Sequence, residues 1–288
     1  MREKSNEKLG LVLEGGAMRG LFSAGVFDAL LEHNIIADGV VGVSAGAAFG
    51  CNYKSGQKGR VVRYNKRFAH EWRYCSVRSW LLTGDLFGAQ FCYHKMPDEL
   101  DVFDRQAFDH SPMEFYAVCT DVNTGKPVYK LLMHAGTDCY DWIRASASMP
   151  IASRIVQLEG YKLLDGGVSD SIPLKFFNEK GYCRNIVVLT QPHGYRKEPN
   201  PMMPLIRLSL RRYPAFVQAM NRRHIMYNQQ LDYVAAEEKA GHAFVIQPEH
   251  NLGIGHTSHD PEEMQATYDL GRLAVERRLS ELEAFISQ

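Results

Sequence analysis

Five residues, Gly42-Val43-Ser44-Ala45-Gly46, follow the short apolar run Gly39-Val40-Val41 and place a serine between two glycines. A buried strand that turns sharply into a helix needs residues without a Cβ atom around the turn, and such a turn lifts the serine hydroxyl clear of the backbone. The pattern therefore predicts a nucleophile elbow with Ser44 at its tip. A serine that only fills a tight turn between a strand and a helix would give the same pattern, so the other motifs must decide.

A second glycine cluster lies upstream of the serine. The apolar run 9–13 leads into Glu14-Gly15-Gly16-Ala17-Met18-Arg19-Gly20, and the segment 21–31 spaces its apolar residues at helical intervals. Backbone amides at the start of this helix would have no partner within the helix, which suits an oxyanion or a phosphate. We therefore expect Gly16, Ala17 and Met18 to offer donors there.

A third motif, Leu163-Leu164-Asp165-Gly166-Gly167, places an acid at the end of an apolar run. Asp165 is too far from Ser44 in the sequence for a local contact. The ends of neighbouring strands in one sheet can nevertheless bring the two side chains together.

These three motifs, in this order, resemble those of the patatin-like phospholipase family, in which a glycine-rich oxyanion turn, a G-x-S-x-G serine and a D-G-[GA] aspartate form a Ser-Asp dyad without histidine. A fourth segment, Arg144-Ala145-Ser146-Ala147-Ser148-Met149-Pro150, is similar to the family's Ala-Ser segment that ends in proline. The resemblance covers roughly residues 8 to 192. It implies an α/β fold, a three-layer α/β/α sandwich with a mostly parallel central sheet. We expect a catalytic domain at 8–192 and a mostly helical C-terminal extension at 199–288 packed on it.

The resemblance also implies a reaction, the hydrolysis of a lipid or phospholipid carboxylic ester through an acyl-enzyme, of the phospholipase A or carboxylesterase type, with no metal and no cofactor. It assigns each motif residue a role. The implied catalytic residues are Ser44 and Asp165; the oxyanion hole is Gly15, Gly16, Ala17 and Met18; the supporting residues are Arg19, Gly20, Gly42, Gly46, Gly166 and Gly167.

Two positions depart from the family pattern. Glu14 stands where the family often has aspartate, and Ala17 replaces the third glycine of the oxyanion run. A Cβ atom disfavours a positive φ, so the hole is expected to need a negative φ at Ala17. Arg19 is expected to brace the turn through its carbonyls or Glu14, with lipid phosphate as the alternative partner.

Other functions remain open at this stage. A Ser-His-Asp esterase of the α/β-hydrolase type needs a histidine after the aspartate, and the chain has His242, His250, His256 and His259 there. A nucleotide site is disfavoured, because Ala17 and Gly20-Leu21-Phe22 fit neither a dinucleotide fingerprint nor a P-loop. A noncatalytic lipid-binding domain is a further hypothesis.

Composition and charge limit the classes of molecule that the protein is expected to bind. The 288 residues are 45% hydrophobic with a formal net charge of zero, so no overall field favours nucleic acid. Two basic runs stand out, at 54–78 and 196–223. Solvated helix faces account for most such runs. The first is mixed with aromatic residues, including Trp72 and Trp80, and so suggests contact with an anionic membrane.

The six cysteines are dispersed without a Cys-x-x-Cys pair, which gives no support for a metal or redox motif. The charged N-terminal residues leave no room for a signal peptide, and no apolar run approaches the roughly 20 residues of a membrane-spanning helix. We therefore expect a cytoplasmic protein, with peripheral membrane contact left open.

Strands are expected at 9–14, 39–43, 115–120, 127–132, 155–158, 161–164, 185–190 and 243–246. Helices are expected after the first two strands and near 139–147, 172–180, 205–240 and 261–286. Their alternation predicts a largely parallel sheet covered on both faces. Asp121 is expected to serve a hairpin turn at 120–127, and Asp260 to cap the last helix.

Overall fold

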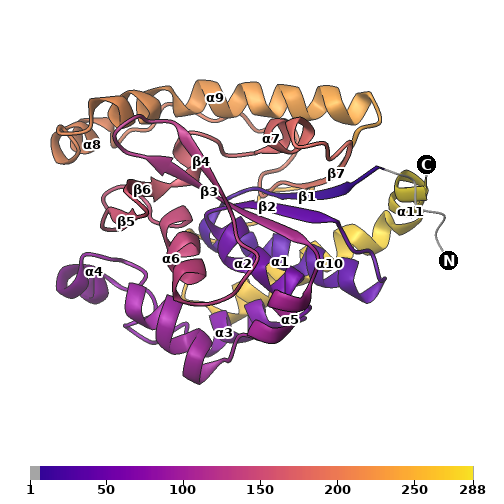
Figure 1. Ribbon diagram of the computed structural model, residues 1–288, viewed down its shortest axis with the longest axis horizontal. Helices are drawn as coiled ribbons and strands as arrows, with labels where there is room; N and C mark the ends of the chain where they lie inside the picture. The colour runs from indigo at the N-terminus through magenta and orange to yellow at the C-terminus, as the bar shows by residue number, and fades with distance from the viewer. Residues whose placement is uncertain (1–6, 288) are drawn as a thin grey trace.

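The computed structural model describes residues 7–287, which build one eight-stranded sheet between two layers of helices (Figure 1). The strand order is β5-β6-β3-β2-β1-β7-β8, and β4 pairs with β3 beside this path. The strands are β1 (Leu9–Leu13), β2 (Gly39–Val43), β3 (Glu114–Asp121), β4 (Pro127–Leu131), β5 (Val156–Leu158), β6 (Tyr161–Asp165), β7 (Arg184–Val188) and β8 (Ala243–Ile246).

Five neighbouring strands, β3, β2, β1, β7 and β8, run parallel. The other three are antiparallel to their neighbours. Side chains alternate across the sheet: Leu9, Leu11 and Leu13 enter one buried cluster, whereas Val12 enters another on the opposite face. The predicted three-layer sandwich with a mostly parallel sheet is therefore confirmed.

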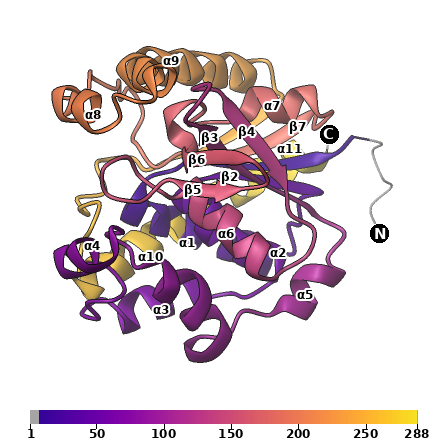
Figure 2. The same cartoon turned by 60° about the vertical axis from the view of Figure 1, so that its left-hand side comes forward.

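Helices cover both faces of the sheet, as Figures 1 and 2 show from two sides. One layer holds α1 (Gly20–Glu32), α2 (Ala45–Lys54), α3 (Arg60–Arg67), α5 (Arg105–His110), α6 (Thr137–Ser146) and α10 (Pro261–Arg277). The other layer holds α7 (Leu174–Glu179), α8 (Met203–Ser209) and α9 (Pro214–Lys239). The remaining helical segments are η1 (Ala17–Arg19), α4 (Val77–Thr83), η2 (Phe91–Leu100), η3 (Gly166–Val168) and α11 (Leu279–Ser287).

The C-terminal region contributes to both the sheet and its helical cover. β8 extends the parallel sheet beyond β7. α10 crosses α1 so closely that a Cβ atom on Gly25 would lie 1.9 Å from the Tyr268 carbonyl oxygen, and one on Gly271 would lie 2.0 Å from that of Phe22. The Tyr268 hydroxyl also donates to the buried carboxylate of Asp28, 2.8 Å away.

Two predicted helices are interrupted. The stretch expected at 205–240 divides into α8 and α9, with Pro214 in the first turn of α9, where its missing N–H costs nothing. The closing helix divides at Arg278 into α10 and α11. The predicted cap at Asp260 is confirmed, since its carboxylate accepts from the amides of Glu262 and Glu263.

The hairpin prediction is confirmed too, because β3 and β4 pair antiparallel across 120–127. Asp121 serves that turn and accepts from the Asn123 amide and the Thr124 hydroxyl. None of the helices within residues 7–287 combines the length and apolar character needed to cross a bilayer.

Candidate active site

Ser44 lies at the sharp turn between β2 and α2. Its φ of 56° and ψ of −121° are unfavourable for a residue with a Cβ atom. The flanking glycines are in close contact: a Cβ atom on Gly42 would lie 2.4 Å from the carbonyl oxygen of Gly46. The Ser44 amide donates to the hydroxyl of Ser146, 2.9 Å away, and so fixes the turn from the end of α6. The structure therefore has the strained elbow that the motif predicts.

Asp165 ends β6 and lies across the sheet from Cys119 of β3. Its carboxylate accepts the Gly167 amide at 2.8 Å, and the Ser44 side chain lies close enough to lower its pKa. Burial raises the pKa of the Asp165 carboxyl, while the Ser44 hydroxyl, the charge of Arg223 and the Gly167 amide act against that rise. Ser44 and Asp165, expected to come together at the ends of neighbouring strands, line the same cavity.

The two glycines of the aspartate motif, Gly166 and Gly167, begin η3. Gly166 packs against β3, since a Cβ atom there would lie 2.1 Å from the Val118 carbonyl oxygen. Gly167 uses both backbone groups: its amide donates to Asp165, and its carbonyl oxygen accepts from Arg223 and Ser171. η3 thus holds the carboxylate of Asp165 in a fixed environment.

The glycine-rich turn that follows β1 packs directly against the elbow. A Cβ atom on Gly15 would lie 3.0 Å from the Cβ atom of Ser44, so a larger residue would displace the serine. Within residues 7–287, the amides of Gly15, Gly16 and Ala17 donate to no backbone or side-chain acceptor. The turn therefore presents free donors beside Ser44. Gly20, at the start of α1, packs against Ala45 of the elbow.

The expected negative φ at Ala17 is wrong, because this residue has a φ of 49°. The turn is constrained on both sides of it: Gly15 packs against Ser44, and the Met18 side chain is buried. Alanine therefore adopts here a conformation that glycine reaches more readily, at a cost of about 1–2 kcal/mol. Its amide remains without an acceptor in the part of the chain that the structure describes.

The expected contacts of Arg19 with Glu14 and the turn carbonyls are also not observed among the described residues. The Arg19 guanidinium reaches His256 instead, with Nη1 2.9 Å from the ring Nε2. Glu14 is buried and accepts from the Thr190 amide and hydroxyl and from the Tyr227 hydroxyl. Glu14 therefore links the end of β1 to β7 and α9, while Arg19 is turned toward the site.

The four histidines considered for a triad lie in different places. His242 contacts Glu237, His259 contacts the Ala69 carbonyl oxygen, and His250 is exposed. His256 borders the cavity beside Ser44. Because an arginine can only donate, the Nε2 atom of His256 accepts from Arg19, and burial together with Arg19, Lys197 and Arg223 lowers the pKa of this ring. His256 thus serves Arg19 as a neutral acceptor.

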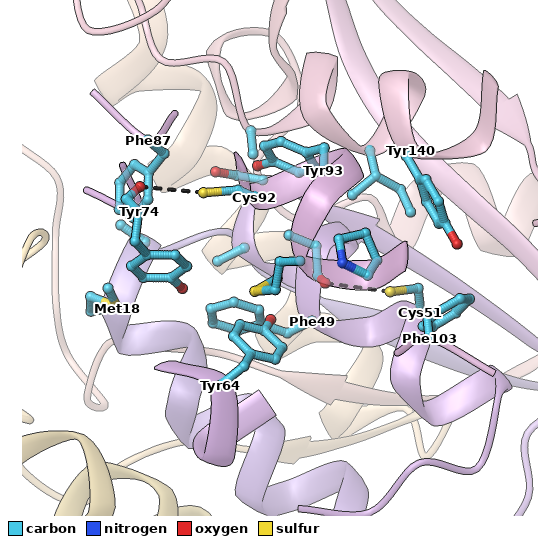
Figure 3. A pocket seen from close by; sticks show the side chains of 18 of the residues that line it. Met18, Phe49, Cys51, Tyr64, Tyr74, Phe87, Cys92, Tyr93, Phe103 and Tyr140 are labelled. Atoms are coloured by element: carbon cyan, nitrogen blue, oxygen red, sulfur yellow. Dashed lines mark hydrogen bonds between the residues drawn. The ribbon is translucent and has the colours of Figure 1, made fainter. Parts of the chain in front are cut away.

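An apolar cavity opens on one side of Ser44, between α2, α3, η2 and α6 (Figure 3). Most of its lining is aromatic, aliphatic or sulfur-containing, with the rings labelled in Figure 3 around the space. The lining side chains include Met18, Phe49, Tyr64, Tyr74, Phe87, Cys92, Tyr93, Met96, Phe103, Tyr140, Ile143 and Met149. Such a surface suits a hydrocarbon chain and offers little to a charged group.

A second cavity on the other side of Ser44 is more polar. Ser44, Ala17 and Met149 border both cavities, so the serine stands at their junction. Arg19, Lys197 and Arg223 contribute three cationic side chains to the second cavity. Met202 and Ile206 of the C-terminal region form part of its wall.

Several of these contacts were not predicted. Ser146 belongs to the Ala-Ser segment, which was recognised only as a motif. Lys197 and Arg223 belong to the second basic run, for which the sequence predicts a solvated helix face. Spacing alone gave no signal for them, because they reach the site only through the packing of α9 and the loop before α8.

Basic residues of the first run are partly engaged inside the protein. Lys54 is buried and donates to the Met133 carbonyl oxygen. Arg60 is also buried, and Arg60 and Arg63 both pair with Asp101. The run at 54–78 is therefore not one continuous cationic surface.

Comparison with known proteins assigns the chain to a protein family. The family model described as patatin-like phospholipase matches residues 11–177, and the chain belongs to this family. Residues 213–287 match a second model, a domain of unknown function (DUF6363).

Among the relatives, an uncharacterized protein of Escherichia coli, YjjU, is 33% identical over 193 residues, covering 64% of this chain and 52% of the relative. Lysophospholipase NTE1 of Scheffersomyces stipitis is 28% identical over 184 residues, covering 62% of this chain and 11% of that protein. The chain thus matches about half of the bacterial relative and a small part of the yeast one.

Two solved structures match the chain at lower sequence identity than these relatives. VipD from Legionella pneumophila matches with a TM-score of 0.45 and 12% identity, over 94% of this chain and 67% of its own. The type III effector protein ExoU matches with a TM-score of 0.42 and 13% identity, over 96% of this chain and 53% of its own.

Proposed function

We propose that the protein hydrolyses carboxylic esters of lipids through an acyl-enzyme formed on Ser44, with Asp165 as the general base. The observation that carries this proposal is the position of Ser44 and the buried Asp165 carboxylate in the wall of one cavity, close enough for the serine side chain to lower the pKa of Asp165. Membership of the patatin-like phospholipase family supports a lipid ester as the substrate. The resemblance of one segment to lysophospholipases favours the same substrate class.

The chemistry proceeds in two halves. The Ser44 hydroxyl attacks the ester carbonyl carbon and passes its proton to the Asp165 carboxylate, and the free amides of the turn 15–17 stabilise the oxyanion. Collapse of the tetrahedral intermediate breaks the bond to the alcohol oxygen, which takes the proton from Asp165. A water molecule then attacks the acyl-enzyme by the same route and releases the fatty acid. The raised pKa of Asp165 suits a group that accepts and returns a proton.

The two cavities suggest how the substrate lies. The apolar cavity would take the acyl chain, since its wall is largely aromatic and aliphatic. The polar cavity would take the alcohol portion, which leaves first. Ser44 at their junction would then face the ester carbon, and apolar contact along the chain would favour long acyl groups.

The dyad has a direct test. A fluorophosphonate probe should label Ser44, and the Ser44→Ala variant should lose both labelling and ester hydrolysis. Asp165→Asn should lower kcat about 10⁴-fold, whereas His256→Ala should retain the bulk of kcat for an uncharged ester. A loss at His256 equal to that at Asp165 would favour the Ser-His-Asp alternative. Activity that survives in Ser44→Ala would contradict the assignment of the nucleophile.

We also propose peripheral contact with anionic membranes through a surface formed by α4 and α8, which lie at the same end of the molecule in both ribbon views (Figures 1 and 2). Leu81 and Leu82 of α4 and Leu208 of α8 are exposed by 72%, 64% and 66%. Exposed Val77, Trp80, Met202 and Leu205 extend this apolar surface.

The same surface adjoins the site and carries positive charge. The Trp80 indole donates to the carbonyl oxygen of Ile151, which borders the polar cavity together with Met202. Neither 77–83 nor 203–213 contains an acidic residue, whereas they carry the exposed Arg78, Arg207, Arg211 and Arg212. Exposed apolar side chains on two helices at one end of the molecule, with exposed arginines on the same segments, fit a bilayer with anionic lipid.

A further inference from the structure

One side of helix α9 faces two of the motifs that surround Ser44. α9 lies within the segment 213–287 that matches a domain of unknown function, and Arg223, Tyr227 and Gln230 follow one another on it at intervals of four and three residues. Residues at this spacing share one side of a helix. Their side chains form hydrogen bonds with the segments at the ends of β1 and β6, which carry the glycine-rich turn and Asp165.

Gln230 contacts the loop that follows η3. Its side-chain oxygen accepts from the amides of Ser171 and Ile172, both at 3.1 Å. Its side-chain nitrogen donates to the buried carboxylate of Asp170, 2.6 Å away, which also accepts from the Tyr129 hydroxyl. One side-chain amide thus binds three consecutive residues, so a shift of this loop would break several hydrogen bonds at once.

Arg223 and Ser171 continue this connection to Asp165. The carbonyl oxygen of Gly167 accepts from the Arg223 guanidinium and from the Ser171 hydroxyl, the latter at 2.7 Å. The Gly167 amide donates to the Asp165 carboxylate at 2.8 Å. The backbone of one residue therefore connects α9 to the carboxylate of Asp165.

Tyr227 contacts the glycine-rich turn through Glu14. Its hydroxyl donates to one oxygen of the Glu14 carboxylate at 2.6 Å, and the second oxygen accepts from the Thr190 amide and hydroxyl. Glu14 and Tyr227 are only 2% and 1% exposed, and a carboxylate buried to this degree is strongly unfavourable without donors. Because Glu14 directly precedes Gly15, its position fixes where the turn 15–17 begins.

We propose that α9 sets the relative position of the glycine-rich turn and the Asp165 loop, with Tyr227 and Gln230 as positioning residues for the reaction at Ser44. The inference rests on the proposed function, since it gives the C-terminal region a part in that reaction. Ser44 itself is fixed from the opposite layer of helices, by the Ser146 hydroxyl at the end of α6 (Figure 1). A rigid helix suits this role, because catalytic groups must stay within about 0.5 Å of the productive geometry.

The contact of Tyr227 can be tested with a transition-state analogue. A long-chain trifluoromethyl ketone adds the Ser44 oxygen to its carbonyl carbon while the proton passes to Asp165, and the resulting oxyanion occupies the place of that in the reaction. Tyr227→Phe should weaken this inhibitor and lower kcat for a soluble ester, each by about tenfold, with KM unchanged. The matched control is Tyr233→Phe, which removes a hydroxyl of the same helix that binds Asn178 instead. Equal inhibition of the two variants would overturn the role of Tyr227.

Gln230 acts on the other motif and should give a different result. The Gly167 amide lowers the pKa of Asp165, so displacement of the loop raises that pKa. Since activity requires the deprotonated carboxylate, the acid limb of kcat/KM should move to higher pH in Gln230→Leu. Gln229→Leu, at the exposed neighbouring position, should leave the limb in place. An unshifted limb in Gln230→Leu would overturn the role of Gln230.

The groups that face Asp165 allow this limb to be assigned to it. The charge of Arg223 acts on Asp165 from α9, and the Gln230→Leu substitution leaves that charge in place. Tyr93 of η2 and Cys119 of β3 also interact with Asp165, and burial raises the pKa of both well above the range of an acid limb. Both side chains therefore stay neutral while Asp165 titrates.

A loss of stability alone would reduce the folded fraction without changing the inhibitor affinity or the acid limb of the folded enzyme. Both are therefore measured at a temperature where circular dichroism shows the variant to be folded. If Tyr227→Phe does not fold, Gln230→Leu and its control decide. Ester hydrolysis that survives in Ser44→Ala would contradict the proposed function. If Ser44→Ala is inactive while Tyr227→Phe and Gln230→Leu match their controls, the positioning role of α9 alone is wrong.

Discussion

The backbone amide of Ser44 donates to the Ser146 hydroxyl, which donates in turn to the carbonyl oxygen of Val118. This bridge connects the strained elbow to the end of α6 and to β3, so it holds a backbone conformation that costs of order 1–3 kcal/mol. Ser146 is thereby a positioning residue for the nucleophile.

We expect Ser146→Ala to lower kcat for a soluble ester by about tenfold or more and to reduce stability by about 1–3 kcal/mol, because the Ser44 amide and the Val118 carbonyl lose a buried partner. The control is Ser148→Ala, two residues along, whose hydroxyl donates to the Arg144 carbonyl oxygen and to no other group within residues 7–287. Stopped-flow labelling by a fluorophosphonate should slow in the first variant and stay near normal in the second. Equal labelling rates would show that the bridge does not position Ser44.

The contact of Ser146 with the Ser44 amide could not be predicted from the sequence. Ser44 and the glycine turn follow the parallel strands β2 and β1, and parallel strands bring such ends to one edge of a sheet. Asp165 ends β6, which is antiparallel to β3, so its place beside Ser44 depends on the register of that pair. Ser146, Lys197 and Arg223 lie on helices or in a loop, where no periodicity marks the direction of one side chain. The positive φ of Ala17 was missed for a related reason, since tertiary packing around Met18 and Gly15 overrides the intrinsic preference of alanine.

The charge of Arg223 should set the acid limb of the pH profile. Its guanidinium lowers the pKa of Asp165, which burial has raised above the ordinary value, and activity requires the deprotonated carboxylate. Arg223→Met should therefore raise the pKa of Asp165 further and shift the acid limb of kcat/KM to higher pH. An uncharged ester is the right substrate, because it brings no charge of its own to the cavity that Arg223 lines. Arg222→Met, at an exposed neighbouring position, should leave the limb in place. An unshifted limb in Arg223→Met would contradict the coupling.

The strain at Ala17 predicts an unusual effect of glycine. Ala17→Gly should leave stability unchanged or raise it by up to about 1 kcal/mol, since relief of the positive φ offsets the greater freedom of the unfolded chain. Ala236→Gly, at an exposed position inside α9, should instead lose about 1 kcal/mol. Urea unfolding of the two variants measures the contrast directly. A loss at residue 17 as large as that at residue 236 would show that Ala17 is not strained.

The membrane proposal can be tested at α4. Transfer of one leucine side chain from water to the bilayer contributes about 1.5–3 kcal/mol, so Leu81→Glu or Leu82→Glu should weaken vesicle binding at least tenfold. Ile36→Glu is the control, because Ile36 is 51% exposed but precedes β2, at the end of that strand opposite Ser44. Co-sedimentation with vesicles that contain phosphatidylglycerol should fall in the α4 variants and with added salt, while hydrolysis of a soluble ester stays near normal.

If charge reversal at Lys58, Arg63 and Arg67 abolished binding and the α4 variants did not, the contact surface would lie on the first basic run instead. Since Arg63 is already paired with Asp101 and Arg67 donates to the Leu100 carbonyl oxygen, we expect those changes to have the smaller effect.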